Sequence, residues 1–118
     1  MVIQNKKLKK ESRSLAGKAY ERLLNKALRE LDADFSEWRA GKIDPWELSD
    51  RIHKFHDGIS RRLYVLAGHN HGQTILSEAI LQGEIPLEDL SAELKEYLRP
   101  SIESLKSIRE ESNKDTTE

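Results

Sequence analysis

Residues 24–63 read LNKALRELDADFSEWRAGKIDPWELSDRIHKFHDGISRRL, and the periodicity of this stretch decides the fold. On either side of its central glycine, apolar residues recur three and four positions apart, which is the spacing of one face of an α-helix. The first set is Leu24, Leu28, Leu31, Phe35 and Trp38, and the second is Leu48, Ile52, Phe55, Ile59, Leu63 and Leu66. We therefore predict one long helix over about 12–40 and a second helix over about 45–67.

The junction between these helices carries a stop signal and a start signal. Gly41 can take the left-handed conformation that commonly ends a helix. Asp44 can accept backbone N–H groups of the following turn, and Pro45 suits the first helical position, where no N–H donor is needed. The sequence therefore predicts a short turn between two helices.

Two tryptophans, Trp38 and Trp46, flank this turn. Large aromatic residues on both sides of a helix junction usually fix it against the core, and this is what we expect here. In the alternative interpretation, one of them lines a pocket or a partner surface together with Tyr64.

The sequence pattern after residue 67 indicates shorter helices. Residues 68–72 have the composition of a turn, and a short buried helix follows that ends at Gly83. Ser91 can cap a last helix, which Pro100 is expected to interrupt. We expect a basic flexible arm over 1–11, one domain over 12–111 and a disordered tail over 112–118. The predicted fold is all-α, an irregular bundle of four to five helices with a long N-terminal helix and the second helix at its centre.

Composition agrees with this fold and excludes several classes of protein. The 118 residues include 36% hydrophobic and 35% charged residues, as expected for a single domain of helices with solvated outer faces. The absence of cysteine excludes disulfides, a thiol nucleophile and thiolate metal sites. No apolar run reaches the ~20 residues of a membrane span or the length of a signal peptide. We therefore expect a cytoplasmic protein that does not bind membranes.

The net charge of −1 is distributed unevenly. Residues 1–30 carry nine Lys or Arg against three Glu, whereas residues 72–118 carry five against eleven Asp or Glu. The basic segment could contact nucleic-acid phosphates. A charged stripe on a long helix is more often its solvated face, and no basic recognition helix is evident, so nucleic-acid binding is the less favoured alternative.

All four histidines lie within residues 53–71, and two of them mark a candidate site. At 100° per residue, one side of the second helix carries a polar and aromatic surface, which we call the shelf. Its members are Trp46, Ser49, His53, His56, Ser60 and Tyr64. His53 and His56 could share a divalent transition metal with Asp50 or Asp57, because imidazole and carboxylate ligands suit such ions. The structural alternative is that both histidines bond to neighbouring backbone or carboxylate groups.

The second histidine pair, His69 and His71, lies in the following turn. Since His69 is ~24 Å of helix rise beyond His53, a single site of four histidines is not expected. Serine next to histidine at helical spacing is common by chance, and no nucleophile elbow or phosphate-binding glycine loop is present. The sequence therefore favours a non-enzymatic protein without a cofactor.

Part of the chain resembles a group of small uncharacterised bacterial proteins that are wholly helical. The resemblance covers about residues 35–64 and rests on the pattern WRxGKIxPxEL, IHxFHDG and RLY, which begins at Trp38. It implies a bacterial cytoplasmic origin and an all-α fold, and it transfers no activity.

Taken together, these features predict a small helical interaction or assembly protein that forms a homodimer, because the first helix is too long for a compact domain of this size. The first alternative is a metal-binding or small-ligand-binding protein that uses His53 and His56. The second is a nucleic-acid-associated protein that uses its basic N-terminal segment.

Overall fold

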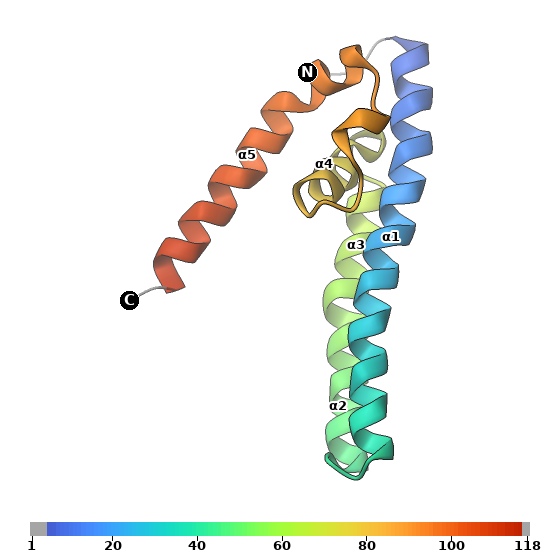
Figure 1. The fold of residues 1–118 in the computed structure, drawn as a ribbon, viewed down its shortest axis with the longest axis vertical. Helices are drawn as coiled ribbons and strands as arrows, with labels where there is room; N and C mark the ends of the chain where they lie inside the picture. The colour runs from blue at the N-terminus through green and yellow to red at the C-terminus, as the bar shows by residue number, and fades with distance from the viewer. Residues whose placement is uncertain (1–4, 117–118) are drawn as a thin grey trace.

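The computed structural model describes the backbone of residues 5–116 and the side chains of residues 5–112. Within this range the regular elements are all helical (Figure 1), which confirms the all-α fold. In chain order they are α1 (Lys6–Arg39), α2 (Pro45–Phe55), the π-helical turn η1 (His56–Ser60), α3 (Arg61–Ala67), the 3-10 turn η2 (Asn70–Gly72), α4 (Gln73–Leu81), the 3-10 turn η3 (Leu87–Asp89) and α5 (Ala92–Thr116).

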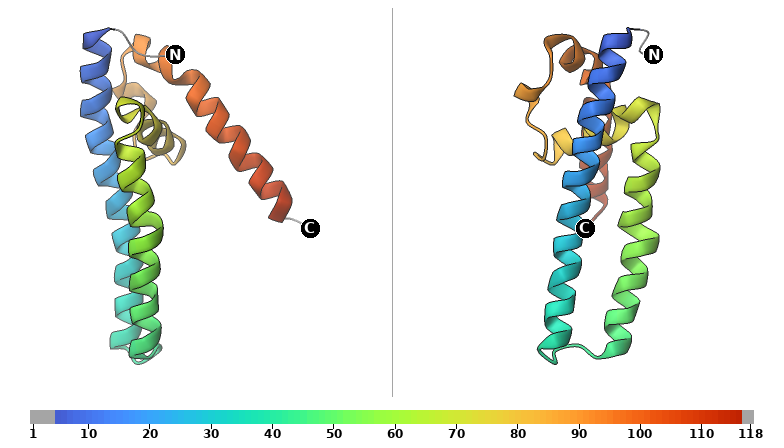
Figure 2. Two further views of the ribbon diagram at one scale, coloured as in Figure 1. Left: turned by 180° about the vertical axis from the view of Figure 1, so that it is seen from behind. Right: turned by 90° about the vertical axis from the view of Figure 1, so that its right-hand side faces the viewer.

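The molecule is a long helical hairpin with a small bundle at one end. Helix α1 runs antiparallel to the continuous segment formed by α2, η1 and α3, and the two lie side by side over most of their length (Figure 2). The bundle lies against one side of the N-terminal half of α1, and α5 diverges from the hairpin (Figure 1). We call residues 24–62, which extend from the bundle, the arm. The Cα principal extents of 53 × 35 × 23 Å confirm that the long first helix overhangs a compact body.

The hydrophobic core lies within this bundle. Its buried members come from the first half of α1, from α3, α4 and α5, and from the connections beside them: Leu15, Ala16, Ala19, Leu23, Leu63, Ile75, Leu76, Ala79, Ile85, Leu90, Leu94 and Leu98. Helix α4 is the central element, since six of its nine residues are buried. In α2 only Leu48 is buried, so the expectation that the histidine-bearing helix is central is wrong. Amphipathic periodicity shows that a helix has a packed face, but it does not show how many neighbours cover it.

Helix α1 begins six residues earlier than predicted. Asn5 caps it by accepting the N–H of Lys7 at 2.9 Å, and Leu8 packs against the core. Glu11 accepts hydrogen bonds from the backbone N–H of Ser91 at 2.8 Å and from its hydroxyl at 2.6 Å. These contacts offset the conformational entropy that the basic segment loses when it becomes helical. The sequence alone does not reveal them, because the partners lie far along the chain. Residues 6–11, which we expected to belong to a flexible segment, are thus the first turns of α1, and residues 1–4 lie outside the described range.

The last helix is also longer and more regular than predicted. Helix α5 passes through Pro100 without interruption and reaches Thr116. Pro100 is exposed, so water can reach the carbonyl group that its missing N–H leaves without a donor. The backbone of residues 112–116, which we expected to belong to a disordered tail, thus continues α5, while residues 117 and 118 lie outside the described range.

The predicted helix boundaries inside the chain are confirmed. Gly41 has a φ of 75° after α1, and Asp44 Oδ1 accepts the N–H of Glu47 at 2.7 Å to cap α2. Gly83 has a φ of 77° after α4, and the Ser91 hydroxyl caps α5 by accepting the N–H of Leu94 at 3.2 Å. These stops and starts are local properties, which is why the sequence predicts them well.

Among the described residues, no helix combines the length and the apolar character that crossing a membrane requires.

Candidate functional site

Five of the six residues of the shelf lie along the arm, and the sixth, Tyr64, lies just beyond its base. Trp46, Ser49 and His53 come from α2, His56 and Ser60 from η1, and Tyr64 from α3. Trp46 is 82% exposed and Tyr64 is 74% exposed. The π-helical turn also changes the alignment, because its i→i+5 bonds rotate the chain less per residue than the α-helical spacing assumed for the shelf. The shelf is therefore an open flank of the arm with a break in its middle.

Hydrogen bonds hold three of the four histidines, two of them through partners nearby in the sequence and His71 through Arg13 of α1. His53 donates from Nδ1 to the backbone oxygen of Ser49 at 2.8 Å, one turn earlier in α2. In the turn before α4, His69 Nδ1 bonds the hydroxyl of Thr74 at 2.7 Å. His71 Nδ1 lies 3.1 Å from a guanidinium nitrogen of Arg13 and must accept, because arginine only donates.

The carboxylates predicted as metal ligands have cationic neighbours on their own helix. Asp50 pairs with Lys54 at 2.9 Å, and this hydrogen bond raises the pKa of Lys54. Asp57 lies 3.9 Å from Arg61. Among the described residues, no three His, Cys, Asp or Glu side chains gather closely enough to hold a metal ion. Metal binding by His53 and His56 therefore stays a prediction, and the described residues supply no third ligand close to them.

The tryptophans do not fix the tip of the arm against the core. Trp38 is 43% exposed, and Trp46 is the more exposed of the two at 82%. Only α1 and α2 meet at this tip, so two aromatic residues have no third element to pack against. The expectation that they anchor the junction is therefore wrong. The alternative, a role at a partner surface, stays a prediction.

The arm has an apolar edge that two helices cannot cover. Leu24, Leu28, Leu31 and Phe35 follow one another at spacings of four, three and four along α1. The bonds of the neighbouring Arg51 to Asp34 and Glu37 place Ile52 of α2 at the level of Phe35. We call these five residues the apolar edge. Leu28 is 43% exposed and Ile52 is 37% exposed, while the other three are half-buried. In a bundle of three or four helices, such positions are covered by another helix.

The opposite edge of the arm is ionic and is organised by Arg51. Its guanidinium group donates to Asp34 at 2.8 Å and to Glu37 at 2.7 Å on α1, and to Glu47 at 3.0 Å on α2. These hydrogen bonds, the one to Glu37 foremost, raise the pKa of Arg51 above its usual range. One cation thus joins the two helices near the tip, where apolar burial is least.

Charge is also segregated along the arm. Its tip half, residues 30–56, carries seven acidic and four basic residues, a net charge of −3. Its base half, residues 24–29 and 57–62, carries four basic residues against one acidic residue, a net charge of +3. Among the described residues, Lys26, Arg29 and Arg62 at the base have no carboxylate partner, and neither Glu30 nor Asp32 toward the tip has a cationic one.

A groove of about 400 Å³ lies beyond the base of the arm. It is lined by the small residues Ala16, Gly17, Ala67 and Gly72 together with Arg13, Tyr20, Glu21 and His71. The groove depends on the turn before α4, since His71 lines it and has a φ of 55°. The hydroxyl of Ser12 donates to the backbone oxygen of His71 at 3.3 Å and holds the turn against α1.

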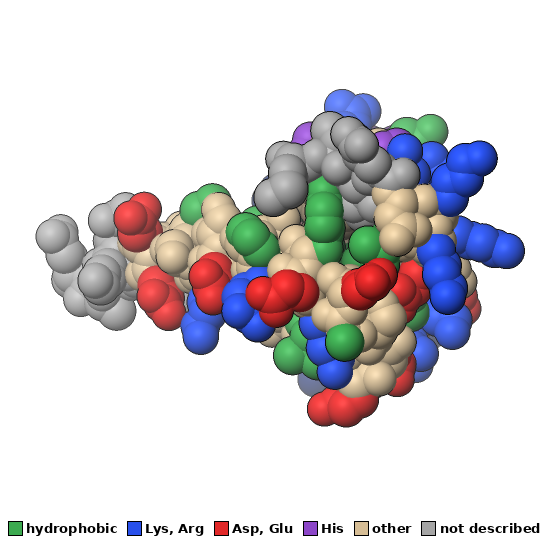
Figure 3. Space-filling model, turned by 90° about the horizontal axis from the view of Figure 1, so that it is seen from above, with side chains coloured by type: hydrophobic (Ala, Val, Ile, Leu, Met, Phe, Trp, Pro, Cys, Tyr) green, Lys and Arg blue, Asp and Glu red, His purple; other side chains and the backbone are tan. Residues whose placement is uncertain are grey.

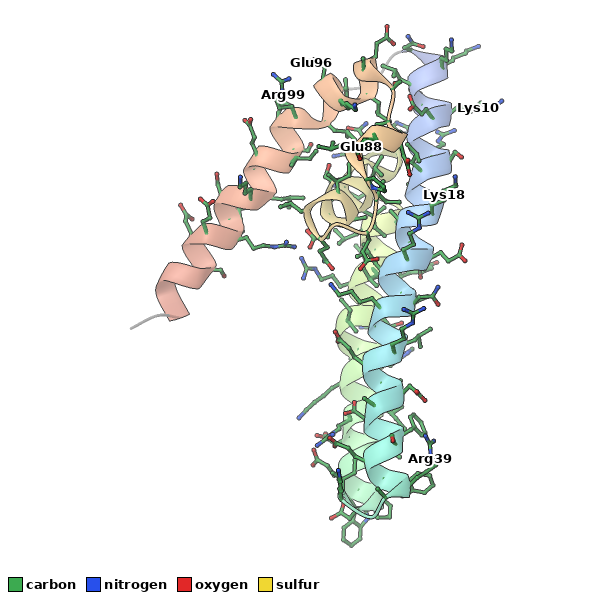
Figure 4. All side chains as sticks on the ribbon, viewed as in Figure 1. Lys10, Lys18, Arg39, Glu88, Glu96 and Arg99 are labelled. Carbon is green, nitrogen blue, oxygen red and sulfur yellow. The ribbon has the colours of Figure 1, made fainter. Side chains whose placement is uncertain are left out.

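Two lysines of the basic N-terminal segment lie on the exposed side of α1. Lys10 and Lys18 point away from α5 on the outer side of α1 (Figure 4). Seen from above, Lys and Arg side chains gather on the side of the molecule where α1 lies, whereas acidic side chains lie over the middle and along α5 (Figure 3). Nucleic-acid binding through this surface stays a prediction.

Sequence reasoning missed the Arg51 network and the pairing of Arg13 with His71. The i,i+4 spacing of Glu47 and Arg51 was a usable signal for one bond of the network. The other bonds depend on the antiparallel alignment of α1 with α2, and Arg13 is 58 positions from His71. Only the tertiary structure brings such residues together.

The comparisons add no relative from which a role could be transferred, because no family model, no curated protein and no solved structure matches this chain.

Proposed function

We propose that this protein is a non-enzymatic assembly module that forms a homodimer through the apolar edge of its arm. The observation that carries the proposal is the exposure of Leu28 and Ile52 in an apolar edge whose other three residues are only half-buried. Contiguous apolar surface of this kind marks sites of association in soluble proteins.

The dimensions of the arm are adequate for a dimer. Two adjacent helices present a face ~20 Å wide, and the part of α1 between residues 21 and 39 is ~27 Å long at 1.5 Å per residue. Interdigitating side chains bury more than this flat projection of ~540 Å², so the ~800 Å² per subunit of a standard interface is within reach. Joining two hairpins yields a four-helix bundle, a stable way to cover such edges.

The test is the molar mass in solution. Size-exclusion chromatography with light scattering, over a range of protein concentrations, should give twice the chain mass of 13.6 kDa for the wild-type protein. The double variant Leu28→Gln, Ile52→Gln should be monomeric, because both positions are partly exposed and tolerate polar side chains within the protomer.

The matched control is Ile108→Gln, which changes an apolar residue on α5 that is 60% exposed and lies outside the arm. It should leave the dimer intact. Far-UV circular dichroism should show the same helical content in all three proteins. A wild-type protein that stays at 13.6 kDa at every concentration would overturn the proposal.

A further inference from the structure

We infer that the two arms associate antiparallel, so that the tip of each arm reaches the groove at the base of the other and Trp46 of each copy occupies that groove. This inference rests on the proposed dimer and specifies its geometry. The occupant of the groove is a second copy of this chain.

The apolar edge and the charge boundary share one centre. On α1 the edge runs from Leu24 to Phe35, and its midpoint falls between Arg29 and Glu30. The net charge of the arm changes from +3 to −3 at the same place. A two-fold axis through this midpoint sets each acidic tip half against a basic base half. A parallel dimer would instead oppose like charges along the whole arm, which is unfavourable.

The groove continues the face of α1 that carries the apolar edge. Arg13, Gly17 and Tyr20 precede Leu24 at spacings of four, three and four, and so extend the same helical stripe toward the bundle. A partner that covers the edge and reaches past the base of the arm therefore arrives at the groove.

The tip of the arm has the reach to fill the groove of a partner. Leu23, Ala27, Ile59 and Leu63 line one depression, and an antiparallel hairpin that sets Leu23 opposite Leu63 and Ala27 opposite Ile59 agrees with the bonds of Arg51 to Asp34 and Glu37. The residue numbers of two facing positions in the hairpin thus add up to about 86. By this relation, Trp46 lies level with Ala40. Trp46 is then ~16 Å of helix rise from the midpoint, while Tyr20 is ~14 Å and Gly17 ~19 Å from it on the other side.

The chemistry of the two surfaces is complementary. The groove offers small apolar residues, an aromatic ring and, in Arg13, a guanidinium group that can lie over an indole ring. Trp46 is 82% exposed within the protomer, which is unusual for the largest apolar side chain. Tryptophan seated in a partner's groove is among the strongest contributors to protein interfaces.

The orientation can be tested with single cysteines, because the chain has none of its own. In an antiparallel dimer, Asp32→Cys near the two-fold axis should form an intermolecular disulfide under mild oxidation. Ala40→Cys near the tip should not, because the two tips are far apart. The reverse result, a disulfide through Ala40→Cys but not through Asp32→Cys, would overturn the antiparallel arrangement while leaving the proposed dimer in place.

The occupant of the groove can be tested by sedimentation equilibrium. Trp46→Ala should raise the dimer dissociation constant tenfold or more, and Trp46→Phe should recover part of the loss. Gly17→Gln changes the groove instead of its occupant and should weaken the dimer as strongly. A Cβ at Gly17 meets nothing within 4 Å in the protomer, so the variant should fold, and the glutamine side chain would fill the groove.

Leu87→Ala is the control, because Leu87 is 45% exposed in η3, away from both surfaces. It should not change the dissociation constant. An antiparallel dimer whose dissociation constant is unaffected by Trp46→Ala and Gly17→Gln would overturn the assignment of the groove. A monomeric wild-type protein would overturn the proposed function itself.

Discussion

Gly72 precedes α4 at the point where the turn meets α1, and it is the position least tolerant of a side chain. Its φ is 83°, and a Cβ there would lie 2.3 Å from the Cβ of Ala16. We expect Gly72→Ala to lower the free energy of unfolding by ~1–3 kcal/mol through overpacking alone. Backbone strain at positive φ should add to this loss. Urea denaturation of the two proteins at equal concentration measures the difference.

Gly17 provides the matched control on the facing helix. A Cβ at Gly17 meets nothing within 4 Å, and the residue lies inside α1. Gly17→Ala should therefore raise the free energy of unfolding by up to ~1 kcal/mol, the difference in helix propensity. Equal effects of the two substitutions would contradict the close approach of the turn to α1.

At the scale of the element, α2 depends on the Arg51 network because it buries only Leu48. Arg51→Met removes the bonds to Asp34, Glu37 and Glu47 while keeping the apolar stem of the side chain. We expect faster amide hydrogen exchange throughout α2 and unchanged exchange in α4, because local opening reports local stability. Mass spectrometry of peptides from each helix measures the exchange rates of α2 and α4 separately.

Lys54→Met serves as the control for this experiment. It removes the exposed i,i+4 pair with Asp50, whose partners are 76% and 52% exposed, and exposed pairs of this kind contribute little. Exchange in α2 should therefore be close to that of the wild-type protein. If Arg51→Met gave the same small effect, the network would not be what holds the tip of the arm together.

At the scale of the whole molecule, the structure is extended. The Cα radius of gyration is 17.0 Å, whereas a compact chain of 118 residues would have a value near ~13.5 Å. Small-angle X-ray scattering of the monomeric variant Leu28→Gln, Ile52→Gln should give a value of at least 17 Å and a maximum dimension above 53 Å. A value near ~14 Å would mean that α5 or the arm folds onto the bundle in solution.

The arrangement of the helices in the whole molecule explains which parts of the candidate site could be predicted from the sequence. The shelf lies along one continuous helical segment, and four of the five residues of the apolar edge lie along α1, so helical spacing places these members without knowledge of the neighbouring helices. The groove, the Arg51 network and the exposure of Trp46 involve segments brought together from distant parts of the chain. Their prediction would have required the position of every helix, which periodicity does not provide.

The sequence by itself determined the inner helix boundaries, the caps at Asp44 and Ser91 and the turn at Gly41, because backbone conformation and capping depend on residues a few positions apart. The tertiary structure decided that residues 6–11 are helical, since Leu8 and Glu11 find their partners far along the chain. It also decided that α4 occupies the centre while α2 extends from the bundle. The physical reason is that an amphipathic face specifies burial in general, whereas the choice of what buries it depends on how all the helices share one core.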